Sequence, residues 1–150
     1  MTFTLELPDQ YGFVLAAATS TFFVTTAHFI RTAKLRKASG VAYPNAYASQ
    51  EHADKNPAAH RFNCAQRAHA NFTENHTALL GSLLISGLKF PLLAASLGGL
   101  WSVARLAYLI GYTSSSGPKG RMVGSTFSFL ADAMLKVVAA YTSYAIIMDQ

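Results

Sequence analysis

Three polar residues at helical spacing carry the chemistry of ligand recognition. Arg67, Asn71 and Glu74 stand at positions i, i+4 and i+7, so a helix places all three on one face. That face offers a cation, an amide and a carboxylate to a small ligand that has both an anionic and an ammonium group. The same residues can instead form a structural network between helices, built on an ion pair of Arg67 with Glu74. Both interpretations stay open on these residues alone.

A second polar face follows in the next apolar segment. Arg105, Tyr108 and Tyr112 stand at i, i+3 and i+7 and again share one side of a helix. Aromatic residues gather at membrane interfaces without any ligand, which accounts for the tyrosines but not for Arg105. Further along, Asp132 and Lys136 have the acid-first i, i+4 order that favours an ion pair within a helix.

Four apolar runs must position these residues. Of the 150 residues, 51% are hydrophobic and 13% are charged, whereas soluble domains average about 25% charged. A membrane-spanning helix needs about 20 apolar residues, and the runs at 11–30, 70–88, 91–112 and 122–148 meet that length. We therefore predict an all-α integral membrane four-helix bundle. It forms one domain over 1–150, with spans at about 11–37, 62–88, 91–114 and 121–148. Residues 1–10 hold Glu6 and Asp9 but no Lys or Arg, which disfavours a secretory signal peptide.

The basic residues predict how the spans are oriented. We expect a connecting loop over 31–61, into which the first helix continues through Lys37, a tight turn before Pro91, and a third loop at 114–118. Loops one and three hold eight Lys and Arg residues, against Lys89 alone elsewhere outside the spans. The positive-inside rule then makes loops one and three cytosolic and both termini luminal or exterior. The eight residues are Arg31, Lys34, Arg36, Lys37, Lys55, Arg61, Lys119 and Arg121.

The net charge and the cysteine content limit which ligands and metals the protein can bind. The chain has a net charge of +5, but its basic residues flank apolar segments, which favours a membrane surface or a small anionic ligand over nucleic acid. A single cysteine, Cys64, excludes an internal disulfide framework and a zinc site of several thiolates, and we expect no metal.

The cytosolic half of the predicted bundle collects a basic set with one acid. Guanidinium groups favour carboxylates, and a glutamate favours an ammonium. A tripeptide such as glutathione satisfies both preferences, and the residue types equally admit a phosphate or a lipid head group. The set comprises Arg36, Lys37, Arg67, Asn71, Glu74, Arg105 and Arg121.

These strings together resemble a known family of membrane proteins. The segments, in order over about residues 11–125, are Tyr11-Gly-Phe-Val-Leu15, Lys34-Leu-Arg36-Lys37, Tyr43-Pro44, Phe62-Asn-Cys64, Gln66-Arg67-Ala-His69-Ala-Asn71-Phe-Thr-Glu74, Arg105 with Tyr108, and Gly111-Tyr112. The sequence resembles the microsomal glutathione S-transferase 3 branch of the membrane-associated proteins of eicosanoid and glutathione metabolism. The string from Arg67 to Glu74 is the most specific part of the resemblance.

The resemblance implies a homotrimer in the endoplasmic reticulum or outer mitochondrial membrane, with glutathione bound between neighbouring subunits near the cytosolic face. It implies that Arg36 and Arg67 meet glutathione carboxylates, and that Asn71 and Glu74 meet its γ-glutamyl end. Tyr108 and Tyr112 would contact the glutathione backbone. His69 and Arg105 would support the site, and Lys37 would also belong to it. Arg121 would face the sulfur as the catalytic residue, and a different placement of the preceding loop would put Lys119 there.

The implied activity is attack by a glutathione thiolate. Attack on a lipophilic electrophile gives a thioether, and attack on a lipid hydroperoxide gives an alcohol and oxidised glutathione. Leukotriene C4 synthase has Gln at the position of His69 and Tyr at that of Asn75, so a transferase is favoured over leukotriene synthesis. The alternatives are a non-enzymatic lipid-binding protein of the same superfamily and a small channel or transporter.

Overall fold

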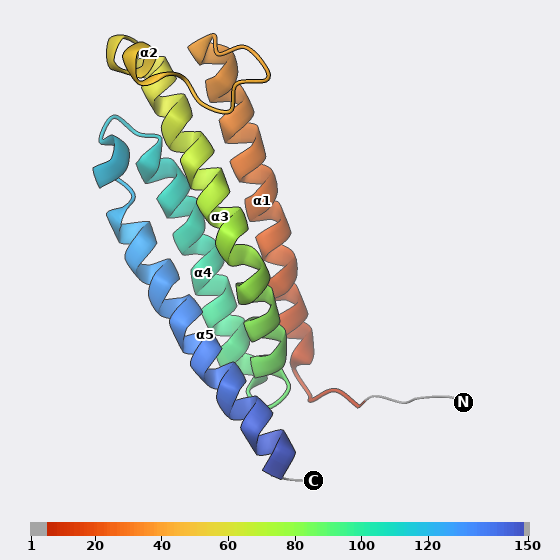
Figure 1. Cartoon of the computed structure of the whole chain (residues 1–150). Coiled ribbons are helices and arrows are strands. Elements are labelled where there is room, and N and C mark those ends of the chain that lie inside the picture. The colour runs from red at the N-terminus through yellow and green to blue at the C-terminus, as the bar shows by residue number, and fades with distance from the viewer. Residues whose placement is uncertain (1–5, 149–150) are drawn as a thin grey trace.

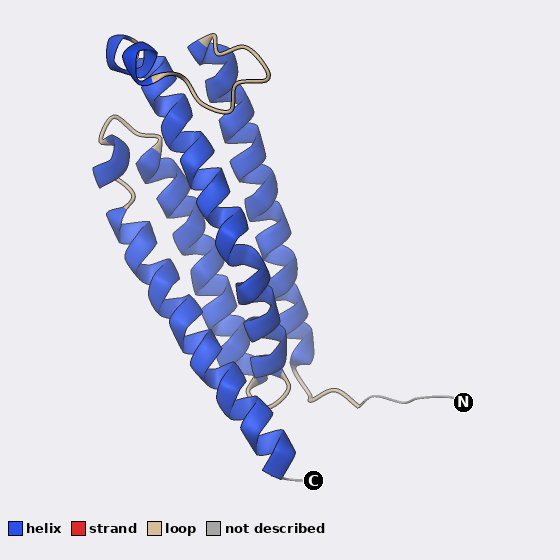
Figure 2. Cartoon of the chain, viewed as in Figure 1, coloured by secondary structure: helices blue, strands red, loops and turns tan. Residues whose placement is uncertain are grey.

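Helices account for the secondary structure of the described part of the chain. The computed structural model describes residues 6–148, and this part contains helices and no strand (Figure 2). Its elements are α1 (Tyr11–Ser39), α2 (Gln50–Lys55), α3 (Pro57–Gly87), α4 (Pro91–Tyr112), the 3-10 helix η1 (Gly117–Lys119) and α5 (Met122–Met148). The prediction of an all-α fold is therefore confirmed.

The long helices α1, α3, α4 and α5 run side by side and alternate in direction (Figure 1). Both α3 and α4 contact each of the other long helices, whereas α1 and α5 lie at opposite edges of the group. The loop carrying α2 and the turn carrying η1 lie at one end of the molecule. The start of α1, the end of α5 and the short α3–α4 turn lie at the other.

Three helical stretches among the described residues are long and apolar enough to cross a membrane. They are Tyr11–Ser39, Pro91–Tyr112 and Gly117–Met148. The stretch in α3 is not among them, because Asn71, Glu74, Asn75 and His76 interrupt its apolar run. Large apolar side chains such as Phe23, Val103 and Phe129 are 67–72% exposed, as expected for surfaces that face lipid.

The core between α1, α3 and α4 holds a row of aromatic rings. The Phe72 ring centroid lies 4.9 Å from that of His28, 4.9 Å from that of His76 and 5.4 Å from that of Trp101. Phe72 and Trp101 are each 1% exposed, so this row fixes α3 between its neighbours.

The connection expected as a loop over 31–61 is more helical than predicted. Helix α1 continues to Ser39, where Gly40 adopts the left-handed conformation common at helix ends. Helix α2 forms within the connection, and α3 begins at Pro57, five residues before the predicted start of its span at 62. The side chain of Asn56 accepts hydrogen bonds from the backbone N–H groups of Ala58 and Ala59, and proline is favoured in the first turn. These local preferences start α3 early.

Candidate functional site

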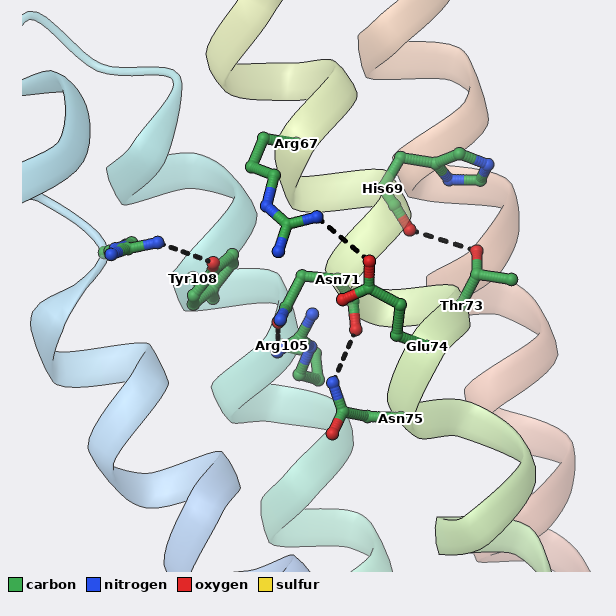
Figure 3. A network of polar contacts seen from close by, with 9 residues as sticks. Arg67, His69, Asn71, Thr73, Glu74, Asn75, Arg105 and Tyr108 are labelled. Carbon is green, nitrogen blue, oxygen red and sulfur yellow. Dashed lines mark hydrogen bonds and ion pairs between the residues drawn. The ribbon is translucent and has the colours of Figure 1, made fainter.

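An ion pair runs along the exposed face of α3. The Nη1 atom of Arg67 lies 2.9 Å from Oε1 of Glu74, and the two side chains are 49% and 53% exposed. Figure 3 shows that Asn71 lies between them on the same helix face. The pair lies within α3, so the predicted structural network between helices does not come from this contact.

Asn71 instead connects α3 to α4. Arg105 donates a 2.9 Å hydrogen bond from Nη1 to Oδ1 of Asn71, and Asn75 donates to the Asn71 backbone carbonyl at 2.7 Å (Figure 3). The Arg105 guanidinium lies 4.4 Å from the Tyr108 ring centroid, and the residue is only 3% exposed. With its carbonyl held by Arg105, Asn71 keeps its side-chain NH2 as a donor for a ligand.

Arg121 at the start of α5 contacts both predicted tyrosines of α4. It donates from Nη1 to the Tyr108 hydroxyl at 3.4 Å, and its guanidinium lies 4.9 Å from the Tyr112 ring centroid. The two tyrosine rings meet edge to face at 5.5 Å. Arg121, rather than Lys119, therefore makes the contacts with this aromatic pair.

Glycines allow α5 to approach α4 closely enough for these contacts. A Cβ atom on Gly120 would overlap the backbone carbonyl of Gly111, and one on Gly124 would overlap the backbone of Tyr108 and Ala104. Only a residue without a Cβ permits such an approach. The place of Arg121 beside Tyr108 thus depends on the glycines at the α4–α5 junction.

Basic side chains dominate the face that α3, α4 and α5 form around the pocket lined by Asn71, Arg105 and Asp132, and this face is called the groove below. Arg67, Arg105 and Arg121 lie on it, and Glu74 is the acid paired with Arg67 at its exposed side. An excess of guanidinium groups in a cleft favours an anionic ligand. Among residues 6–148, no three His, Cys, Asp or Glu side chains gather closely enough to hold a metal ion.

The pocket in this groove has a volume of about 140 Å³ and lies between α3, α4 and α5. Sequence reasoning missed most of its lining, although Ser125, Ser128 and Asp132 share a helix face at i, i+3 and i+7. The predicted ion pair of Asp132 with Lys136 is confirmed, at 2.5 Å. The lining residues are Asn71, Asn75, Trp101, Arg105, Ser125, Ser128, Phe129 and Asp132.

Three predicted site residues lie elsewhere, on the α1 side of α3. The Arg36 guanidinium lies 4.4 Å from the Tyr43 ring centroid and 4.6 Å from that of Phe62. Arg36 and His69 line a separate pocket of about 200 Å³, and Figure 3 shows His69 pointing toward α1. Lys37 lines a shallow pocket with Arg36. Within one chain, the predicted set therefore divides into two groups.

A comparison with protein families matches residues 14–141 to the MAPEG family. This family contains glutathione transferases and peroxidases, leukotriene C4 synthase and lipid-binding proteins. The match extends from the first turn of α1 into the second half of α5, and it includes every residue of the groove described above. With most of its length covered in this way, the chain belongs to the MAPEG family.

Proposed function

We propose that this protein is a membrane-bound glutathione transferase that also reduces lipid hydroperoxides. The observation that carries the proposal is the groove between α3, α4 and α5. It combines the exposed Arg67–Glu74 pair with Arg121 beside two tyrosines. Glutathione has two carboxylates, one ammonium and one thiol, so each of these charged groups has a partner on the ligand.

Glutathione binding replaces the ion pair between Arg67 and Glu74 with contacts from each residue to the ligand. Because the Arg67 and Glu74 side chains are about half exposed, a ligand can reach both without opening the core. A glutathione carboxylate pairs with the Arg67 guanidinium, and the γ-glutamyl ammonium pairs with the Glu74 carboxylate. Asn71 donates from its side-chain NH2, and Arg105 holds that amide in place through its 2.9 Å hydrogen bond.

The reactive group is the glutathione thiolate. A free thiol has a pKa of about 8.5 and is mostly protonated at neutral pH. A guanidinium within about 4 to 6 Å lowers the pKa of an acid by roughly 1 to 3 units. Arg121 supplies that charge. It donates to the Tyr108 hydroxyl and lies 4.9 Å from the Tyr112 ring centroid, and we assign the two tyrosines to orienting the sulfur.

Two reactions follow from an activated thiolate. Sulfur attack on an electrophilic carbon forms a thioether and expels the leaving group. Sulfur attack on a hydroperoxide oxygen breaks the O–O bond, and a second glutathione then gives oxidised glutathione, water and the alcohol. The protein forms no covalent intermediate in either reaction.

The proposed assembly is a homotrimer, in which glutathione lies between neighbouring subunits. Arg36, Lys37 and His69 lie on the α1 side of α3, away from the Arg121 groove. A neighbouring copy would bring them to the glutathione held by the first copy. Mass measurement of the protein in lipid nanodiscs should give three chains per particle.

The proposed location is the endoplasmic reticulum or outer mitochondrial membrane, with α3 crossing the membrane alongside the other long helices. The α2 loop and the η1 turn lie at the same end of the molecule (Figure 1), and they hold most of the basic residues outside the spans. This arrangement supports cytosolic placement of both loops and of the glutathione groove.

Turnover of a chromogenic electrophile by purified protein tests the proposal. Product should form with glutathione and not without it, and an alternative thiol that lacks the γ-glutamyl group should react poorly. A protein that binds lipid but gives no glutathione-dependent product would be the non-enzymatic type of family member. Preferred turnover of an eicosanoid epoxide over simple electrophiles would favour leukotriene C4 synthesis.

A further inference from the structure

The pocket below the glutathione groove places charged groups deep among apolar helices. Arg105 is 3% exposed and Asp132 is 7% exposed, and both line it together with Ser125 and Ser128. Charged side chains within membrane segments are costly to bury and mark functional sites by default. The proposed glutathione contacts use Asn71 and the Arg105 group that holds it, but leave the deeper part of the pocket unassigned.

Several polar atoms of this pocket have no partner among the described residues. Arg105 uses Nη1 on Asn71, whereas its Nε and Nη2 atoms are buried without a hydrogen bond. Asp132 uses Oδ2 on Lys136, whereas its Oδ1 atom is buried without one. Two residues that line the pocket thus hold two donors and one acceptor that the fold does not satisfy, and buried polar groups in native proteins normally have partners.

These atoms determine which chemical group can bind in the pocket. Arg105 and Asp132 carry opposite charges, which favours a neutral ligand group over a second carboxylate beside Asp132. That group must donate one hydrogen bond and accept others. A hydroperoxide has one O–H and two oxygens and does both, whereas a carbonyl electrophile has no O–H for Asp132. The pocket of about 140 Å³ holds such a group and a few carbons, and a longer tail would leave past Phe129, which is 68% exposed.

We infer that the Arg105–Asp132 pocket binds the hydroperoxide group of a neutral lipophilic substrate. Asp132 Oδ1 accepts the hydroperoxide O–H, and Arg105 donates from Nε and Nη2 to the oxygens. This inference rests on the proposed function and adds to it a subsite that selects hydroperoxides over electrophiles that lack an O–H group. Asp132 and Arg105 are the residues that determine this selectivity.

The subsite adjoins the proposed thiolate site. The Arg105 guanidinium lies against the Tyr108 ring at 4.4 Å, and the Tyr108 hydroxyl accepts from Arg121. The thiolate attacks the O–H oxygen, the S–O bond forms and the O–O bond breaks, which leaves glutathione sulfenic acid and an alkoxide. Arg105 stabilises the alkoxide, which takes up the proton released when the thiol ionised. A second glutathione reduces the sulfenic acid and yields the disulfide and water.

Trp101 gives a direct readout of occupancy that needs no turnover. It is the single tryptophan of the sequence, it lines the pocket, and it is 1% exposed. Cumene hydroperoxide is a suitable probe, and cumene is its matched control because it has the same apolar body without the hydroperoxide. Titration of purified protein with cumene hydroperoxide should change Trp101 fluorescence saturably, and cumene should not.

The same titration compares the wild type with three variants. Asp132→Leu removes the hydrogen-bond acceptor, and Asp132→Asn keeps an uncharged acceptor. Asp54→Asn, on exposed α2, is the control. We expect the apparent Kd for cumene hydroperoxide to rise at least tenfold in Asp132→Leu and about threefold in Asp132→Asn. The control should match the wild type. If Asp132→Leu fails to fold, the comparison rests on Asp132→Asn.

Two results would overturn the inference: equal responses to cumene and its hydroperoxide, or an unchanged Kd in the folded Asp132 variants. Glutathione-dependent turnover of a chromogenic electrophile is measured in parallel. If the wild type shows no turnover but keeps the fluorescence response, the proposed function is wrong and the pocket is still a hydroperoxide-binding site. If the wild type shows turnover but no fluorescence response, only the inference about the pocket is wrong.

Discussion

Arg121 donates a 3.4 Å hydrogen bond from Nη1 to the hydroxyl of Tyr108 and thereby joins the start of α5 to the second half of α4. Its guanidinium also lies 4.9 Å from the centre of the Tyr112 ring. A fixed cation beside two phenol groups is the arrangement expected for stabilising a bound thiolate.

Replacing Arg121 with alanine should lower turnover more than it lowers glutathione affinity. Without the nearby charge, the bound thiol returns toward a pKa of about 8.5, so about 3% is ionised at pH 7. A pKa lower by roughly 1 to 3 units ionises a quarter or more of the thiol at that pH. Turnover at pH 7 should therefore fall about tenfold or more, and raising the pH toward 9 should recover much of it.

The control for this experiment is Lys119→Ala, two residues earlier in η1. That variant should keep its rate near that of the wild type, because Arg121 makes the contacts with Tyr108 and Tyr112. Ultraviolet absorbance of the bound thiolate gives the ionised fraction directly. An Arg121→Ala protein with wild-type turnover and wild-type thiolate absorbance at pH 7 would show that another group activates the thiol.

Glu74→Gln should weaken glutathione binding and leave the helices assembled. The change removes the proposed partner of the γ-glutamyl ammonium, and losing a charged partner costs about 1 to 3 kcal/mol, or roughly 5- to 150-fold in Kd. Glu51→Gln is the matched control, because Glu51 pairs with Lys55 at 2.6 Å on exposed α2. Calorimetric titration with glutathione measures both. Equal affinities in the two variants would assign the Arg67–Glu74 pair a structural role only.

The sequence predicted best where one helix carries the whole pattern. The spacing of Arg67, Asn71 and Glu74 placed them correctly on one face, and the i, i+4 order of Asp132 and Lys136 predicted their ion pair. The apolar runs predicted the long helices, because the length of a span and the period of a helix are local properties.

Contacts between helices could not be predicted in this way. Nothing local to Asn71 shows that Arg105 is its partner, since that contact depends on the packing of α3 against α4. The same spacing rules did not reveal that His69 faces α1 while Arg67 faces the groove. The apolar pattern does not predict the early start of α3, because its first residues are polar or small; Pro57 is typical of loops but also of a first helical turn, and Asn56 before it is a favourable N-cap.

The orientation of the helices is testable with a single reporter cysteine. Ala46 lies exposed in the loop between α1 and α2, and no side-chain hydrogen bond is lost when it is replaced. In an Ala46→Cys, Cys64→Ala protein, an impermeant maleimide should label Cys from the cytosolic side of sealed microsomes. Labelling that requires opening of the membrane would place this loop, and the groove with it, on the luminal side.

Gly124→Ala tests whether the close approach of α5 to α4 positions Arg121. An added Cβ would overlap the backbone of Tyr108 and Ala104, so α5 must move away and take Arg121 from the Tyr108 hydroxyl. Gly99→Ala is the matched control, because Gly99 lies within α4 and a Cβ there meets nothing within 4 Å. Alanine also has the higher helix propensity, by about 1 kcal/mol, so the control should be at least as stable as the wild type. We expect Gly124→Ala to reproduce the pH-dependent loss of turnover of Arg121→Ala, together with a lower thermal midpoint. Wild-type rates at pH 7 in Gly124→Ala would show that the position of Arg121 does not depend on this contact.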